Sequence, residues 1–221
     1  MSDDSFIREV NEELRQDQAK ALWKRYGPIV IGAAVAVVLA TAAWVGYEYW
    51  VQSRANASGD RFSAALDMAE QGQSDEALAA FEELEAEGYG AYPVLARLRA
   101  ATVLAGQGDL DGAVSEFDAV AADGSVPAAI RDMARLRAGY ILVDSGSYEE
   151  VSSRVEVLTA DSSHLRHAAR EALALSAWRE GRSADALSLF EQIVADDAAP
   201  RNTRQRAGVM VELIRGSGAG S

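Results

Sequence analysis

The longest apolar stretch of the chain runs from Gly27 to Tyr47 and contains no charged residue. A helix over these residues would be about 30 Å long, because an α-helix rises 1.5 Å per residue. This length matches the thickness of the hydrocarbon core of a bilayer. The pattern therefore predicts a single membrane-spanning helix, within residues 26–50, in preference to the buried helix of a soluble protein.

The residues on either side of this stretch predict its orientation. Five basic residues lie within the 20 residues before it, whereas the first basic residues after it are Arg54 and Arg61. Lysine and arginine resist translocation, so the N-terminal segment, residues 1–25, should stay in the cytoplasm and the longer remainder should cross. Within that segment, the spacing of apolar residues predicts a helix over 3–22, either a solvated lead into the membrane or a cytoplasmic contact surface.

A cleaved signal peptide is the alternative interpretation of the apolar stretch. Ala40, Thr41 and Ala42 fit the small-x-small pattern of a cleavage site. However, the preceding segment is long for the basic region of a signal peptide and contains six acidic residues, and the apolar run continues past Ala42. We therefore expect an uncleaved anchor.

After the apolar stretch, one pattern occurs four times. Each copy begins at a glycine, and the four glycines are separated by 36, 38 and 35 residues: Gly72, Gly108, Gly146 and Gly181. A small or slim residue follows five positions later, and larger apolar residues follow four and seven positions beyond it. These three sets are Ala77, Ala113, Val151 and Ala186; Phe81, Phe117, Val155 and Phe190; and Leu84, Val120, Leu158 and Ile193. The spacing places all three sets on one face of a helix.

The segments before the glycines repeat as well. The pentapeptide Ala-Arg-Leu-Arg-Ala occupies both 96–100 and 134–138. Twelve residues before each small residue of the second helix stands another small residue, namely Ala65, Ala101, Gly139 and Ala174. Each unit is therefore predicted to be a helix, a tight glycine turn and a second helix, and such hairpins bury their apolar faces by stacking.

The predicted fold class is therefore all-α: a single N-terminal transmembrane helix followed by an α-solenoid of about four degenerate helical hairpins, over residues 51–215. Residues 202–214 are expected to form a last helix, in which Val209, Leu213 and Ile214 cover the open end of the stack. The residues that follow, 216–221, have the composition of a disordered tail.

Charge and composition narrow the possible functions. The net charge of -13 argues against nucleic-acid binding and against docking on anionic lipid. His164 and His167 are spaced to share a helical face and could serve as two metal ligands, but Asp161 is the single nearby carboxylate. The chain has no cysteine and no catalytic motif. We therefore expect no metal, no cofactor, no small-molecule substrate and no enzymatic activity.

The first helices of the hairpins supply the candidate binding surface. Helical repeat arrays bind partners on their concave side, which the first helices line. An unusually apolar set of residues is expected there, suited to an extended or helical peptide; the alternative is that several of them are core contacts. The set is Leu95, Leu98, Met133, Leu136, Tyr140, Leu175 and Trp178.

The period, the small residue of the first helix and the alanine-x-x-x-phenylalanine of the second resemble the tetratricopeptide repeat, or its Sel1-type relative, over residues 58–200. The pattern departs from that repeat where arginine replaces an aromatic residue, at Arg97, Arg135 and Arg170. The whole layout resembles the YfgM-type ancillary subunit of the bacterial SecYEG translocon, whose repeat domain is similar to that of periplasmic cell-division coordinators.

This resemblance implies a single-pass protein of the bacterial inner membrane with its repeats in the periplasm. It also implies two partners, the SecYEG translocon and a membrane-anchored periplasmic chaperone of the peptidyl-prolyl isomerase type. The expected function is a non-enzymatic scaffold that brings the chaperone or an exported client chain to the translocon. A cell-envelope or cell-division scaffold, and a receptor-like adaptor that signals through residues 1–25, remain as alternatives.

Overall fold

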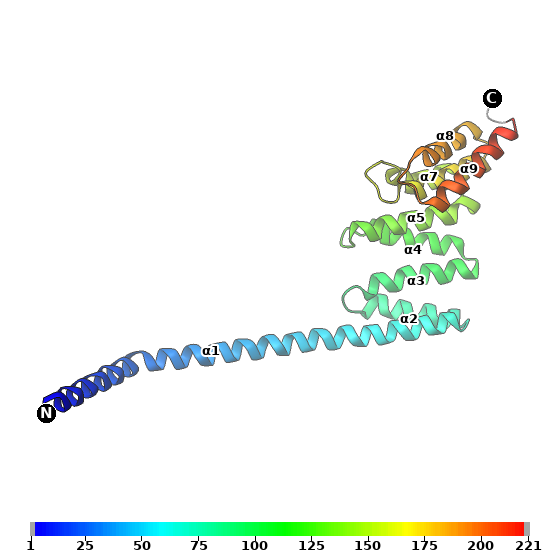
Figure 1. The fold of residues 1–221 in the computed structure, drawn as a ribbon. Coiled ribbons are helices and arrows are strands. Elements are labelled where there is room, and N and C mark those ends of the chain that lie inside the picture. Colours follow the sequence, from blue (N-terminus) through cyan, green and yellow to red (C-terminus); the bar gives the residue numbers. More distant parts are fainter. Residues whose placement is uncertain (1–2, 219–221) are drawn as a thin grey trace. The chain divides into compact units, whose positions relative to one another are not determined.

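A computed structural model describes the backbone of residues 3–218 and the side chains of residues 20–218. The described residues form nine α-helices, one short 3-10 helix and no strand (Figure 1). The all-α fold class predicted from the sequence is therefore confirmed. The chain divides into two compact units between Asn56 and Ala57.

The first unit consists of most of helix α1, which runs from Asp3 to Glu70. The predicted N-terminal helix and the predicted membrane span both lie in α1, and Pro28 lies inside the helix. Within the described residues, α1 is the helix that is long and apolar enough to cross a membrane. Its apolar side chains are exposed; Val38 and Leu39, for example, are 65% and 64% accessible. A signal sequence would meet the same criterion, so retention as an anchor stays a prediction.

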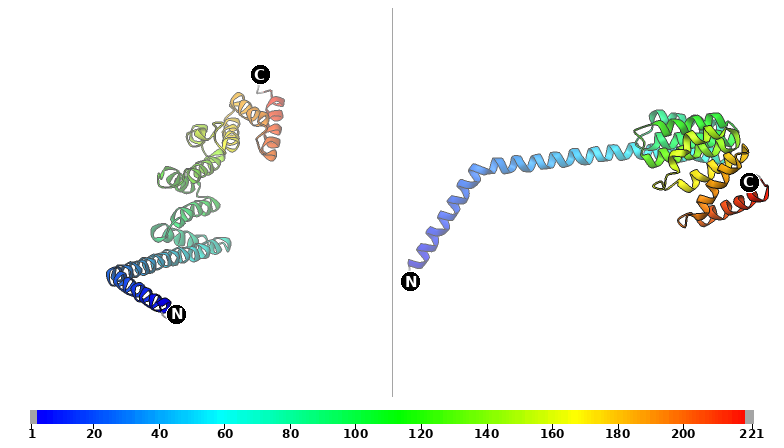
Figure 2. Two further views of the ribbon diagram at one scale, coloured as in Figure 1. Left: turned by 60° about the vertical axis from the view of Figure 1, so that its left-hand side comes forward. Right: turned by 90° about the horizontal axis from the view of Figure 1, so that it is seen from above.

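The second unit is a stack of helical hairpins (Figures 1 and 2). Consecutive helices from α2 to α9 pack against one another. The end of α1, over residues 57–70, pairs with α2, and a last helix follows the fourth hairpin alone. The bounds are α2 Ser74–Glu87, α3 Tyr92–Gln107, α4 Leu110–Ala122, α5 Ala128–Ser145, α6 Tyr148–Val155, the 3-10 helix Glu156–Leu158, α7 Arg166–Arg179, α8 Ser183–Ala195 and α9 Arg201–Gly216.

Three of the four predicted glycine turns use the left-handed backbone conformation. Gly72, Gly108 and Gly181 have φ values of 78°, 89° and 78°. Glycine adopts this conformation without steric cost, and it ends the preceding helix. The turn at Gly146 differs, because its φ is -104°. There the side chain of Ser147 caps α6 instead, in a reciprocal capping box with Glu150.

The residues of the repeated pattern form the core. All twelve residues predicted to face inward from the second helices are buried, at 0–3% exposure. The small residues of the first helices are buried as well. At Gly139 a Cβ atom would lie 2.4 Å from Cγ1 of Val155, so α5 and α6 require glycine at this contact. The predicted close approach of the two helices is therefore confirmed in the third hairpin.

The end of the stack differs from the prediction. Ile214 is fully buried, but Val209 and Leu213 are 64% and 53% exposed, so the prediction that they cover the stack was wrong. The reason is that α9 packs on the fourth hairpin through the face that carries Ala207 and Val211. No helix follows α9 in the described residues to cover its other face. Of the predicted disordered tail, residue 216 ends α9, and residues 219–221 lie outside the described residues.

Candidate protein-binding surface

Three of the predicted surface residues are exposed on the first helices. Leu95 on α3 is 37% accessible, and Met133 and Tyr140 on α5 are 40% and 39% accessible. Met133 and Tyr140 are seven residues apart, so they lie on the same face of α5, two turns from each other. The first helices therefore present apolar area to solvent at the places that the repeat pattern predicts.

The other four residues of the set contribute less area. Leu98, Leu175 and Trp178 are partly buried, because they also pack against the core clusters of the stack. Leu136 is only 5% exposed and belongs to the core. We therefore leave Leu136 out of the surface that we propose below.

Tyr140 connects this face of α5 to α7. Its hydroxyl group donates a hydrogen bond of 3.3 Å to the carbonyl oxygen of Ala168. Burial raises the pKa of Tyr140, and the negative charge of Glu171 adds to this, while Arg206 opposes it. Tyr140 therefore stays neutral and can donate this hydrogen bond to the neighbouring first helix.

An apolar groove with a volume of about 520 Å³ lies between α7, α8 and α9. This size lies within the range of protein pockets that hold ligands. Two of its lining residues, Glu171 and Arg206, are near enough to Tyr140 to influence its pKa. Sequence reasoning found Leu175 in this lining and missed most of the rest. The residues lining what we call the apolar groove are Glu171, Leu175, Phe190, Asn202, Gln205, Arg206, Val209 and Met210.

One ion pair lies in the apolar groove. The two carboxylate oxygens of Glu171 each accept a hydrogen bond of 2.8 Å from the guanidinium group of Arg206. The Glu171 side chain is 8% exposed and that of Arg206 is 55% exposed. The hydrogen bonds to Glu171 raise the pKa of Arg206. Because the buried carboxylate is compensated in this way, the groove is close to neutral as well as apolar.

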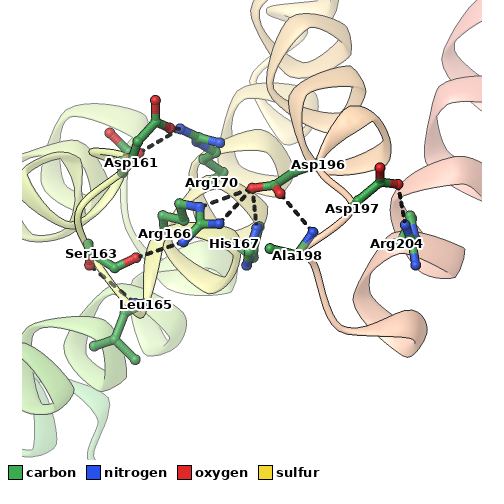
Figure 3. A network of polar contacts seen from close by, with 11 residues as sticks. Asp161, Ser163, Leu165, Arg166, His167, Arg170, Asp196, Asp197, Ala198 and Arg204 are labelled. Carbon is green, nitrogen blue, oxygen red and sulfur yellow. Dashed lines mark hydrogen bonds and ion pairs between the residues drawn. The ribbon is translucent and has the colours of Figure 1, made fainter.

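A second polar network fixes the connection from α8 to α9 (Figure 3). Asp196 accepts hydrogen bonds from the guanidinium group of Arg166, at 3.0 and 2.9 Å, and from the backbone N–H of Ala198, at 2.9 Å. Nε2 of His167 lies 2.7 Å from the same carboxylate. These contacts, led by His167, hold the pKa of Asp196 well below its usual range. His167 is therefore engaged in a structural contact, and no group of metal-ligand residues occurs among the described residues.

The arginines that replace an aromatic residue of the repeat have a shared role that sequence reasoning missed. Each one binds the end of the preceding second helix or the turn that follows it. Arg97 pairs with Glu85 of α2, Arg135 donates to the carbonyl oxygen of Ala121 at 3.4 Å, and Arg170 donates to that of Thr159 at 2.9 Å. Arg135 and Arg170 thus bind carbonyl groups that lack partners within the helix, where a cation is favourable, whereas Arg97 binds a side-chain carboxylate. The recurrence of arginine was the signal that could have revealed this role.

Comparison with known proteins adds a family match. A family model described as a tetratricopeptide repeat-like domain matches residues 20–171, which is more than half of the chain. The matched range includes the apolar part of α1 and the repeat helices up to the start of α7. No curated protein matches the chain.

Proposed function

Because the chain belongs to the family of tetratricopeptide repeat-like domains, we propose that it is a membrane-tethered scaffold whose first helices bind a segment of another protein. The observation that carries this proposal is the exposed apolar area of Leu95, Met133 and Tyr140 on the first helices, together with the apolar groove. Apolar area of this kind, when it forms a continuous surface, favours association with a partner.

The expected ligand is an extended or helical peptide segment with apolar side chains. Tyr140 offers a ring held by the stack, and the apolar groove offers a recess for side chains next to it. Tethering through α1 would raise the local concentration of a weakly bound partner at the membrane. A weak peptide site is therefore sufficient for the function.

At a finer level, we propose that the chain is a single-pass protein of the bacterial inner membrane, with its N-terminus in the cytoplasm and its repeats in the periplasm. The excess of basic residues before the apolar stretch supports this orientation. The resemblance in layout to the YfgM-type subunit supports a role as an ancillary part of the SecYEG translocon that links it to a periplasmic chaperone during protein export. A cell-envelope or cell-division scaffold is the alternative.

Site-specific crosslinking in the intact membrane tests the binding surface. A photo-crosslinking residue is placed at Tyr140 or Trp178 and, as a matched control, at Ser188, which is exposed on the outer face of α8. The proposal expects crosslinks from the first two positions and none, or far fewer, from Ser188. Equal yields from all three positions would contradict it.

Purification of the crosslinked products identifies the partner. Translocon or chaperone subunits would support the finer proposal, whereas division proteins would favour the alternative, and cytoplasmic regulators would favour an adaptor that acts through residues 1–25. A reporter fused after Ser221 tests the orientation separately. If a reporter that functions only in the cytoplasm is active at this position, the proposed periplasmic location is wrong.

A further inference from the structure

A second groove lies on the other side of α3 from Leu95 and Leu98. Successive residues of an α-helix are rotated by about 100°, so Ala100 and Leu104 lie roughly 200° and 240° around α3 from Leu98. These two residues form part of a groove of about 540 Å³ between α2, α3 and α4. The residues lining what we call the acidic groove are Leu78, Glu82, Glu85, Ala86, Ala100, Leu104 and Glu116.

The acidic groove combines an apolar floor with carboxylates along its length. Leu78, Ala100 and Leu104 are partly buried and supply the floor. Three carboxylates accompany them, and the nearby cation is Arg97, which pairs with Glu85 and lies 3.4 Å from Glu116. Glu82 is exposed and has no ion-pair partner among the described side chains. The groove therefore keeps a net negative charge after its internal pairing.

The negative charge of α2 is only partly compensated by the fold. The helix contains six acidic residues and no lysine or arginine: Asp75, Glu76, Glu82, Glu83, Glu85 and Glu87. Arginines outside α2 compensate most of the charge near its end: Arg61 lies 3.2 Å from Glu83 and 3.6 Å from Glu87, and Arg97 pairs with Glu85. Glu82 is the remaining carboxylate in this part of the helix, without an ion-pair partner among the described side chains. Glu82 and Glu85 are three residues apart, so their charges repel each other.

We propose that the acidic groove binds a basic segment of a protein partner, in which apolar side chains lie between lysine or arginine residues. The apolar side chains would contact Leu78 and Leu104, and the cationic groups would pair with Glu82 and with the carboxylates of Glu85 and Glu116. Such pairing would relieve the repulsion within α2 as well as steer the partner. This site is separate from the surface around Tyr140 and does not depend on the proposed function.

Other occupants fit the groove less well. Nucleic acid and anionic lipid would be repelled by the carboxylates. A bound metal ion needs several ligand atoms around one point, and no such group of residues occurs in the part of the chain that the structure describes. Carboxylates distributed along an apolar floor match a row of cationic side chains instead.

Peptide binding to the detergent-solubilised full-length chain tests the proposal. The probe is a fluorescent peptide as long as α2, built from lysine and leucine with the leucines on one helical face; the control peptide has glutamate in place of lysine. Fluorescence anisotropy at low salt should show binding of the lysine peptide alone. In the double variant Glu82→Gln/Glu116→Gln, affinity for it should fall about fivefold, because two ion pairs are lost.

Two further variants test whether a loss of affinity arises in the acidic groove itself. Glu149→Gln/Glu212→Gln removes two exposed carboxylates on α6 and α9, so it changes the net charge equally without touching the groove. It should alter the affinity by less than about twofold. Tyr140→Ala should leave it unchanged. The proposal is overturned if the lysine peptide fails to bind, if both double variants weaken binding equally, or if Tyr140→Ala weakens it as much.

Discussion

The apolar groove and the acidic groove lie on different hairpins of the same repeat pattern, and their carboxylates differ in burial and in ion pairing. In the apolar groove, Glu171 is buried at 8% exposure and Arg206 binds both of its oxygens. In the acidic groove, the side chains of Glu85 and Glu116 are 33% and 36% exposed and share Arg97. Glu82 is exposed and has no ion-pair partner among the side chains that the structure describes. The charge of the apolar groove is therefore neutralised by an ion pair, whereas the acidic groove keeps a net negative charge.

The comparison shows where a repeat protein can vary its surface chemistry. Glu171 stands three residues before the small residue of its first helix, where the second and third hairpins have Leu98 and Leu136. At that position Glu171 places a charge where the other two hairpins have leucine, and Arg206 compensates it. The charge of the acidic groove comes largely from the composition of α2, whose exposed face can carry charged residues without disturbing the core of the stack.

The first prediction uses the floors of the two grooves. Phe190, which lines the apolar groove, is 1% exposed and packs in the core of the fourth hairpin. Phe190→Ala should lower the free energy of unfolding by about 3–5 kcal/mol. Leu78→Ala in the acidic groove should cost about 1 kcal/mol, because Leu78 is only partly buried. Urea titration of the detergent-solubilised chain, monitored by circular dichroism, measures both values. Equal losses of stability would contradict the expected difference between the floors of the two grooves.

The second prediction concerns the buried ion pair. Arg206→Ala leaves Glu171 buried without its partner and should lower the free energy of unfolding by about 2 kcal/mol; the loss is moderated because water can reach the site that Arg206 vacates. The double variant Glu171→Leu/Arg206→Met should recover most of this loss, since it gives position 171 the leucine that the second and third hairpins have there. The same urea titration measures both. A double variant no more stable than Arg206→Ala would show that the carboxylate is not the cause.

The hairpins and their core could be predicted from the sequence because their determinants are local. The glycine turns, the small residues of the first helices and the apolar faces of the second helices each repeat at a fixed spacing. The structure places Ala77, Phe81 and Leu84, for example, in one buried cluster with Ala65. Periodicity of this kind indicates which face of a helix is apolar, and stacking of the hairpins then buries that face.

Pairings between residues distant in sequence could not be predicted. Arg206 and Glu171 are 35 residues apart, and nothing in the sequence selects Glu171 over the other acidic residues. The exposure of the candidate surface residues was predicted only in part for a related reason. Leu136 and Met133 share a face of α5 by spacing, but burial depends on the neighbouring helices, so Leu136 is 5% and Met133 is 40% exposed. The uncovered face of α9 likewise depends on the absence of a following helix in the described residues.

The third prediction concerns the polar network around Asp196 at the α8–α9 connection. The pKa of Asp196 is lowered in the folded chain by His167, Ala198 and Arg166, so its ionised form stabilises the fold at pH values above its usual pKa of about 3.9. This contribution is lost as the pH falls and the carboxylate is protonated. Asp196→Asn should therefore destabilise the chain at pH 7. No such loss of stability at pH 7 is expected for Glu82→Gln.

Thermal unfolding at a series of pH values checks this expectation. The difference in unfolding temperature between the wild-type chain and Asp196→Asn should be largest at pH 6–7 and should shrink as the pH approaches 3. A difference that stays constant with pH would mean that the charge of Asp196 is not responsible.

The smallest predicted effect has the opposite sign. Glu82→Gln removes one of the repelling charges of α2 and should raise the free energy of unfolding by a few tenths of a kcal/mol at low salt. The gain should disappear at about 1 M salt, where charges farther apart than about 3 Å are screened. High-precision urea titrations at both salt concentrations, with Glu149→Gln as the control, measure it. A variant that is more stable but binds the lysine peptide less well would indicate that α2 keeps its acidic residues for binding and not for folding. A stability that falls in Glu82→Gln would show instead that this carboxylate has a structural role, and the contrast between the two grooves would no longer hold.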